Sequence, residues 1–123
     1  MTRLFGSVLL AGLCFGAAMA EAELPPLACE GAAPDWTLTL AGPVAQLTIE
    51  RPIDMTVPQS SVAEGADWPR ALTLVGDRDT AIVILDEEMC STAHAKGFPI
   101  EAHILTQRGT TPILLTGCCT VAE

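Results

Sequence analysis

Short segments in which apolar and polar residues alternate dominate the chain between residues 36 and 116. In the first segment, Trp36, Leu38 and Leu40 would lie on one face of a strand and Thr37 and Thr39 on the other. Six further segments are rich in β-branched or apolar residues and bounded by Gly, Pro or Asp: Val44–Ile49, Ile53–Val57, Ala71–Val75, Thr80–Leu85, Phe98–Thr106 and Pro112–Thr116. Seven strands at this spacing predict an all-β fold, a single small antiparallel β-barrel or barrel-like sandwich.

The connections between these segments are short and contain turn-forming residues. Ala41-Gly42-Pro43, Gly76–Asp79 and Gln107–Thr111 place Gly, Pro and Asp between apolar runs. Tight turns predict that strands adjacent in sequence pair antiparallel. The stretches Gln59–Trp68 and Asp86–Lys96 lack the alternation, and we expect isolated helical turns there, too short to form a layer.

The charge of the chain excludes several classes of partner. Its 123 residues include 15 Asp and Glu against 6 Lys and Arg, a formal charge of −9. Nucleic-acid binding requires clustered Lys and Arg, and anionic lipid surfaces attract the same basic residues. We therefore expect one small acidic domain that binds no nucleic acid.

The N-terminal segment has the organisation of a secretory signal peptide. Arg3 precedes an uncharged apolar run over residues 4–20, which closes on Ala18-Met19-Ala20 as an A-x-A-like cleavage site. Two alternatives stay open. One is an uncleaved anchor, because 17 apolar residues reach the lower limit of a membrane span. The other is a lipoprotein attached through Cys14, although Leu13 before it is not the small residue that lipid attachment requires.

Cleavage after Ala20 defines the domain organisation that we expect. Residues 1–20 would be the signal peptide, 21–28 a linker and 29–123 a single β domain. The mature chain would carry fifteen acids against five bases. This organisation predicts a periplasmic or secreted protein without a stable membrane span after cleavage.

Four cysteines remain after the predicted cleavage: Cys29, Cys90, Cys118 and Cys119. An even number in an exported chain predicts two disulfides. A bond between the neighbours Cys118 and Cys119 would strain a ring across one peptide unit, so we favour the two connectivities that separate them. On a strand these two sulfurs would point to opposite faces and need different partners. Both of these connectivities remain open on the residues alone.

Several motifs resemble a family of uncharacterised bacterial envelope proteins, usually labelled predicted membrane protein or putative lipoprotein. They are Cys29-Glu30-Gly31 with Pro34-Asp35-Trp36-Thr37-Leu38-Thr39-Leu40, the central Trp68, Cys90-Ser91 with Phe98-Pro99, and the ending Leu115-Thr116-Gly117-Cys118-Cys119. The family pattern has a G-x-E-P-F-W-x-L opening, a C-S-D-G-M-S-D-x-x-Y-P centre and a terminal G-C-C or G-C-A. The chain departs from this pattern at 92–97 and at Ala33-Pro34-Asp35.

The resemblance implies a disulfide pairing but no activity. Since the family ending is either G-C-C or G-C-A, the first cysteine of that pair should be the partner of the central one. The resemblance therefore implies the bonds Cys90–Cys118 and Cys29–Cys119.

No residue pattern in the chain indicates catalysis. The sequence contains no G-x-S-x-G motif, no phosphate-binding glycine loop and no carboxylate pair at a marked spacing. We expect no catalytic residue, no metal and no cofactor. The leading hypothesis is a non-enzymatic domain that binds a protein or a small ligand in the cell envelope. One specific version is inhibition of a basic wall-degrading enzyme, because a rigid acidic domain is steered toward a cationic target.

The competing hypothesis is a periplasmic metal-binding or thiol-redox protein. Its ligands would come from Cys90, His94, His103, Cys118 and Cys119, with Asp86, Glu87 and Glu88 nearby. The spacing matches no structural zinc motif, and thiolates compete badly with disulfide formation outside the cytoplasm. We therefore expect His94 in a loop and His103 facing outward on a strand.

The two tryptophans have different expected positions. Trp36 alternates with Leu38 and Leu40 and should lie in the core, while Trp68 before Pro69 should cap the barrel or line a groove.

Overall fold

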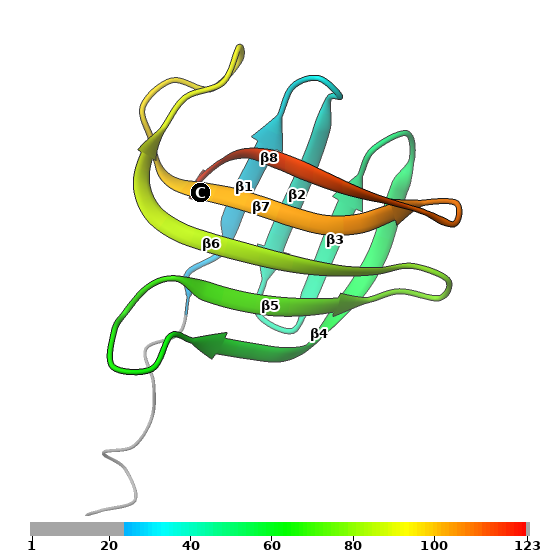
Figure 1. Ribbon diagram of the computed structural model, residues 1–123, viewed down its shortest axis with the longest axis horizontal. Helices are drawn as coiled ribbons and strands as arrows, with labels where there is room; N and C mark the ends of the chain where they lie inside the picture. The colour runs from blue at the N-terminus through cyan, green and yellow to red at the C-terminus, as the bar shows by residue number, and fades with distance from the viewer. Residues whose placement is uncertain (1–23, 123) are drawn as a thin grey trace, which may run out of the picture.

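The structure is a computed structural model that describes residues 24–122, and these residues form eight strands and no helix (Figure 1). The strands are β1 (Leu27–Gly31), β2 (Trp36–Ala41), β3 (Val44–Thr48), β4 (Pro52–Val62), β5 (Arg70–Val75), β6 (Thr80–Cys90), β7 (Phe98–Arg108) and β8 (Thr111–Val121). Each strand pairs antiparallel with the next, and β1 pairs with β8 to close the barrel. The predicted all-β antiparallel barrel is confirmed.

The strands β1–β3 cross β5–β8 steeply, and β4 connects the two groups (Figure 1). The first part of β4 pairs with β3 from Pro52 to Thr56. Its ladder with β5 begins only at Thr56, opposite Val75, and is interrupted before Gln59. An irregularity of this kind bends a strand and changes its twist. As a result, Pro52–Met55 pair with β3 alone and make no ladder with β5.

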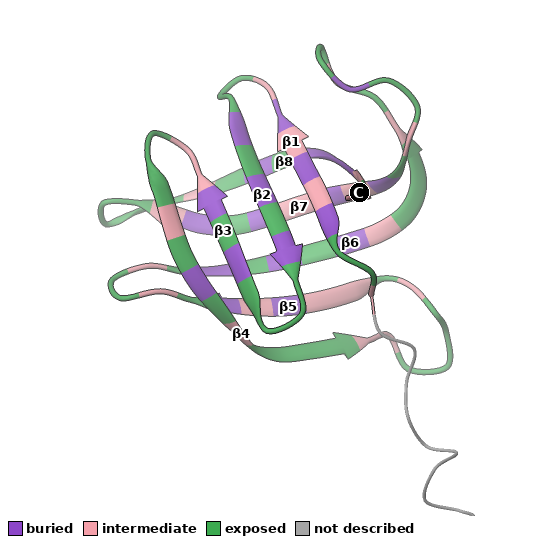
Figure 2. Ribbon diagram, turned by 180° about the vertical axis from the view of Figure 1, so that it is seen from behind, coloured by how far each residue is buried: buried purple, intermediate pink, exposed green. Residues whose placement is uncertain are grey.

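Buried and exposed residues alternate along the strands (Figure 2), and the side chains of the buried residues form the core of the barrel. In β2 the burial pattern alternates strictly, with Trp36, Leu38 and Leu40 buried and the residues between them exposed. The side chains with no exposed surface include Leu38, Leu74, Val83, Leu85, Ala102 and Ile104. An eight-stranded barrel has an interior just wide enough for such side chains to fill, so the fold presents its outer surface and turns to ligands.

Trp36 packs across the barrel interior against two glycines. Its indole Nε1 donates a hydrogen bond to the Thr116 carbonyl oxygen at 3.2 Å. A Cβ atom at Gly31 or at Gly117 would overlap the indole ring. The predicted core position of Trp36 is confirmed, at 3% exposure. Glycine at both positions makes the space that the indole needs.

Both disulfides form with the pairing that the family resemblance implied. Cys29–Cys119 joins directly opposed residues of β1 and β8 inside the barrel, with a Cα–Cα distance of 3.9 Å. Cys118 lies on the opposite face of β8 and bonds to Cys90 at the end of β6. The Cys118 side chain is nevertheless fully buried, as is Ala95 in the β6–β7 loop. Adjacent cysteines therefore secure the two faces of one strand.

The predicted tight turns are confirmed. Hairpins turn at Gly42-Pro43, at Gly76–Asp79 and at Gly109-Thr110. Gly42 and Gly109 have φ values of +61° and +65°, a conformation that glycine adopts without a steric cost.

Three expectations differ from the structure. Strand β1 was not predicted, and it begins at Leu27, inside the expected linker 21–28. The expected helical turns at Gln59–Trp68 and Asp86–Lys96 are wrong, because β4 and β6 continue to Val62 and Cys90. Pairing with β5 and β7 continues both strands beyond the point where their own residues alternate.

The N-terminal predictions concern residues that the structure does not describe. The signal peptide at 1–20, including Cys14, lies outside the described residues. Within 24–122 no helix is long and apolar enough to cross a membrane.

Candidate functional site

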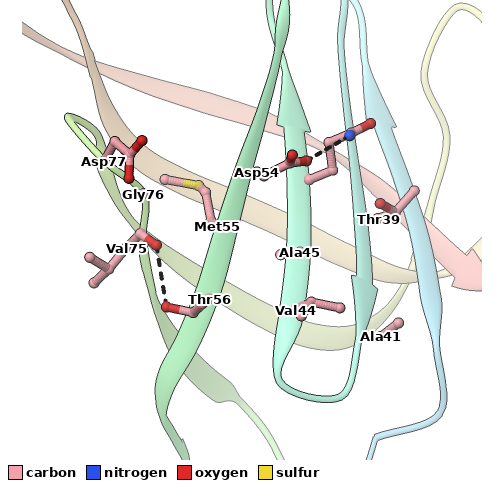
Figure 3. Close-up of a pocket in the computed structure, with 11 residues that line it drawn as sticks. Thr39, Ala41, Val44, Ala45, Asp54, Met55, Thr56, Val75, Gly76 and Asp77 are labelled. Atoms are coloured by element: carbon pink, nitrogen blue, oxygen red, sulfur yellow. Dashed lines mark hydrogen bonds between the residues drawn. The ribbon is translucent and has the colours of Figure 1, made fainter.

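An open groove of about 600 Å³ runs across the outer surface of β2, β3 and β4 to the turn between β5 and β6 (Figure 3). We refer to it as the groove. It is lined by Thr39, Ala41, Val44, Ala45, Gln46, Asp54, Met55, Thr56, Val75, Gly76 and Asp77. It lies beside the part of β4 that has no β5 partner.

One side of the groove is largely apolar. The strand register aligns Ala41, Val44, Thr56 and Val75 across four strands. Val44 and Val75 are 53% and 39% exposed, high values for aliphatic side chains. The Thr56 hydroxyl donates a hydrogen bond to the Val75 carbonyl oxygen at 3.3 Å, which links the two strands where their ladder begins. This row offers an apolar surface on rigid strands.

The other side of the groove is polar and ends on a carboxylate. The register aligns Thr39, Gln46 and Asp54. The Gln46 side-chain amide Nε2 donates a hydrogen bond to Asp54 Oδ1 at 2.9 Å (Figure 3). A carboxylate accepts several hydrogen bonds, so this contact orients Asp54 without using its whole capacity.

A second carboxylate comes from the β5–β6 turn. The Gly76 amide donates to the Asp79 carbonyl oxygen at 2.8 Å, which closes the turn. A Cβ at Gly76 would lie 3.1 Å from the Asp54 carbonyl oxygen, so the turn lies against β4. Asp77, the next residue, therefore lines the same groove as Asp54.

This arrangement suits a ligand that is both apolar and cationic. The aliphatic stem of a Lys or Arg side chain can lie on an apolar surface while its charged head stays in a polar environment. A guanidinium or ammonium group forms strong hydrogen bonds to carboxylates. The groove offers both surfaces on adjacent strands.

The residues that the competing hypothesis proposed as metal ligands take part in other contacts. All four cysteines within the described part of the chain are in disulfides, so none of these four offers a thiolate. His94 lies in the β6–β7 loop and contacts Asp35 at 3.8 Å, whereas His103 faces outward from β7 and contacts Glu101 at 3.4 Å. Both predicted histidine positions are confirmed. Among residues 24–122, no group of three or more His, Cys, Asp or Glu side chains is placed to hold a metal ion.

Trp68 caps the barrel rather than lining the groove. Its side chain is partly buried against the core, and the Arg70 guanidinium lies 5.2 Å from the ring centre. Of the two positions expected from the sequence, the capping position is the one that the structure supports.

The groove residues were not predicted as a site. Their alternation with core residues places Thr39, Gln46 and Asp54 on the outer face, and this signal is present in the sequence. Their meeting depends on the β2–β3–β4 register, and the position of Asp77 depends on how the β5–β6 turn lies against β4.

Comparison with known proteins adds no relative. No protein-family model matches the chain, and neither a curated protein nor a solved structure is found to be similar to it.

Proposed function

We propose that the protein is a non-enzymatic binding domain of the cell envelope that recognises a basic partner protein through the groove. The observation that carries this proposal is that two carboxylates, Asp54 and Asp77, and an exposed apolar row line the same groove on a rigid surface. A Lys or Arg side chain of the partner would lie along Val44 and Val75 with its charge beside the carboxylates.

The overall charge supports a basic partner. Residues 24–122 carry twelve acids against five bases. A negative field of this kind attracts cationic proteins over distances beyond direct contact and raises their association rate. A basic wall-degrading enzyme such as a c-type lysozyme is the specific partner that we propose to test.

The scaffold supports binding rather than chemistry. The groove is built on paired strands of a closed barrel that two disulfides hold. Rigid binding surfaces lose little conformational entropy when they bind, which favours affinity. The disulfides fit an oxidising compartment, and a periplasmic or secreted location is part of the proposal. The resemblance to bacterial envelope proteins agrees with that location.

The test uses the full chain, exported so that both disulfides form, and a c-type lysozyme as the probe. We expect inhibition of lysozyme and a measurable Kd by calorimetry. The double variant Asp54→Asn, Asp77→Asn should weaken binding at least tenfold, which corresponds to about 1.4 kcal/mol.

The control variant removes the same charge from a different surface. Glu64→Gln with Asp67→Asn changes two exposed residues of the β4–β5 loop and should leave the Kd within twofold. If wild-type protein in large molar excess neither binds nor inhibits lysozyme, the basic-enzyme partner is excluded. If both double variants weaken binding equally, the attraction is diffuse and the groove is not the site.

The thiol state separates this proposal from the metal or redox alternative. An intact mass measured after alkylation without reduction should show no alkylated cysteine in the exported protein. Alkylated cysteines would give the alternative the free thiolates that it requires.

A further inference from the structure

Two further hollows extend the groove along the first half of β4. The nearer hollow, of about 440 Å³, shares Asp54 and Asp77 with the groove and adds Arg51 and Arg78. A smaller one, of about 100 Å³, shares Arg51 with the nearer hollow and adds Arg108. The groove and the two hollows therefore lie next to one another along β4, and we refer to the three together as the cleft.

The far end of the cleft gathers most of the positive charge of the described chain. Arg51 and Arg78 lie in the turns between β3 and β4 and between β5 and β6, and Arg108 is the last residue of β7, before the turn to β8. They are three of the five bases in residues 24–122. The three arginines are far apart in the sequence, and the barrel topology brings them to the same end.

The three guanidinium groups are available for a ligand. Glu50 and Asp79 also line this end of the cleft. Even so, within residues 24–122 none of these three arginine side chains has an ion-pair or hydrogen-bond partner. A guanidinium binds a carboxylate through two parallel hydrogen bonds, so this end can hold an anionic group against the nearby acids.

The spacing of the two charged ends matches a short stretch of extended peptide. Arg51 directly precedes β4, and Asp54 is the third residue of that strand. At about 3.3 Å per residue of extended chain, their backbone positions are at most about 10 Å apart. An extended ligand would span this distance with two or three residues.

We propose that the cleft binds the carboxyl end of a peptide that carries a Lys or Arg two residues before its terminal residue. The basic side chain would enter the groove beside Asp54 and Asp77, and the terminal carboxylate would meet Arg51 and Arg78. This inference rests on the proposed cation-binding groove. It adds the direction in which the peptide lies, the number of residues between its basic side chain and its end, and a carboxylate as the second group that is bound.

The test is an NMR titration of the ¹⁵N-labelled, disulfide-bonded full chain with acetyl-Ala-Lys-Ala-Ala as the probe. The peptide with a free carboxylate should bind about tenfold more tightly than the same peptide with a C-terminal amide. Replacing its lysine by the neutral norleucine should weaken binding to a similar extent. Amide shifts should concentrate at Arg51–Thr56 and Gly76–Asp79.

Variants of the protein assign each contact. Arg51→Gln with Arg78→Gln should abolish the preference for the carboxylate and leave the affinity for the amidated peptide unchanged. Asp54→Asn with Asp77→Asn should weaken both peptides. Lys96→Gln, which removes a positive charge from the β6–β7 loop, is the control and should change neither affinity. A native pattern of amide shifts in each variant confirms that it is folded.

The outcomes separate this inference from the function on which it rests. If the two peptides bind equally, or if neither binds, the inference is wrong, and the lysozyme experiment still decides the proposed function. The peptide acetyl-Ala-Lys-Ala-Glu with a C-terminal amide carries its carboxylate on a side chain. If it binds as tightly as acetyl-Ala-Lys-Ala-Ala with a free C-terminal carboxylate, the cleft binds a side-chain carboxylate equally well and recognition of a chain terminus is excluded. A tenfold preference for the free acid that disappears only in the double arginine variant supports the inference.

Discussion

At the scale of single residues, the packing of Trp36 depends on atoms that are absent from its neighbours. Gly31 and Gly117 face inward on β1 and β8, and the indole occupies the space that a side chain would fill at either position. Alternation in the sequence predicted that Trp36 would be buried. It could not predict the two glycines as its partners, because a residue without a side chain carries no hydrophobic signal.

The substitution Gly117→Ala should therefore be among the most destabilising small changes in the protein. Its Cβ would overlap the carbonyl oxygen of Glu30, a backbone atom that cannot move without disturbing the β1–β8 pairing. We expect a loss of about 3 kcal/mol or more, at the upper end of overpacking effects, measured by urea unfolding of the oxidised protein. Gly109→Ala is the control: nothing lies near its Cβ, and its positive φ alone should cost about 1 kcal/mol. Equal losses in the two variants would contradict this account.

The substitution Trp36→Phe tests the indole itself. It removes the hydrogen bond to the Thr116 carbonyl oxygen and part of the buried ring. We expect a loss of about 2 kcal/mol, seen as a lower Tm, from the cavity and the unpaired carbonyl together. The remaining fluorescence should come from Trp68 alone. An unchanged Tm would mean that the indole is not important for the packing of this region.

At the scale of secondary-structure elements, β8 is the strand on which closure of the barrel depends. It pairs with β7 along nearly its whole length and with β1 at its C-terminal end. Both disulfides end on this strand, one on each face.

Removing the two disulfides separately should give unequal effects. Replacing Cys29 and Cys119 by Ala opens a loop of about 91 residues, for which chain entropy predicts a loss of about 4.6 kcal/mol. Replacing Cys90 and Cys118 opens about 29 residues, with an expected loss of about 3.6 kcal/mol. Urea unfolding of each double variant measures the difference. A larger loss for the shorter loop would show that local packing outweighs chain entropy here.

The second of these variants should also loosen one loop selectively. The amides of Ala95 and Gly97 donate to the Thr92 and Ser91 hydroxyls at 3.0 Å each, within the loop that Cys90 anchors. Without the Cys90–Cys118 bond we expect hydrogen exchange at these two amides to accelerate at least tenfold, while exchange in β2 follows global unfolding only. Unchanged exchange at Ala95 would mean that its burial, not the disulfide, holds the loop.

The alternation of buried and exposed residues decides which strands the sequence could predict. Strands such as β2 and β7 alternate between core and solvent, and their pattern is visible in the residues. Strand β1 contributes only Leu27, Cys29 and Gly31 to the interior, a short and weakly apolar set. The outer part of β6, from Asp86 onward, passes beyond the core and is held by pairing with β7 and by Cys90, so its own residues do not alternate.

At the scale of the whole molecule, charge is distributed unevenly over an acidic barrel. Three of the five bases in residues 24–122 gather at one end, beside Glu50, Asp54, Asp77 and Asp79, and the other eight acids lie elsewhere. Sequence composition predicted the net charge, but the gathering of the three arginines follows from the order in which the turns meet around the barrel.

This charge distribution predicts a strong salt dependence for the proposed basic partner. Raising the ionic strength from about 0.02 M to about 0.5 M should slow association with lysozyme by tenfold or more, because screening shortens the Debye length. Dissociation should change much less, since it depends on close contacts. Stopped-flow fluorescence measures both rates. An association rate independent of salt would show that the acidic surface does not guide the encounter.

The pairing of β1 with β8 brings the first and the last strand of the barrel side by side. The Ala122 amide donates to the Pro26 carbonyl oxygen at 2.8 Å, so the two ends of the described chain lie side by side. A short peptide linker could join them, and the backbone could be cut instead at the two-residue turn between β7 and β8. The eight strands would keep their neighbours in such a circular permutant. The order of the strands along the chain is then one of several orders that would give the same closed barrel.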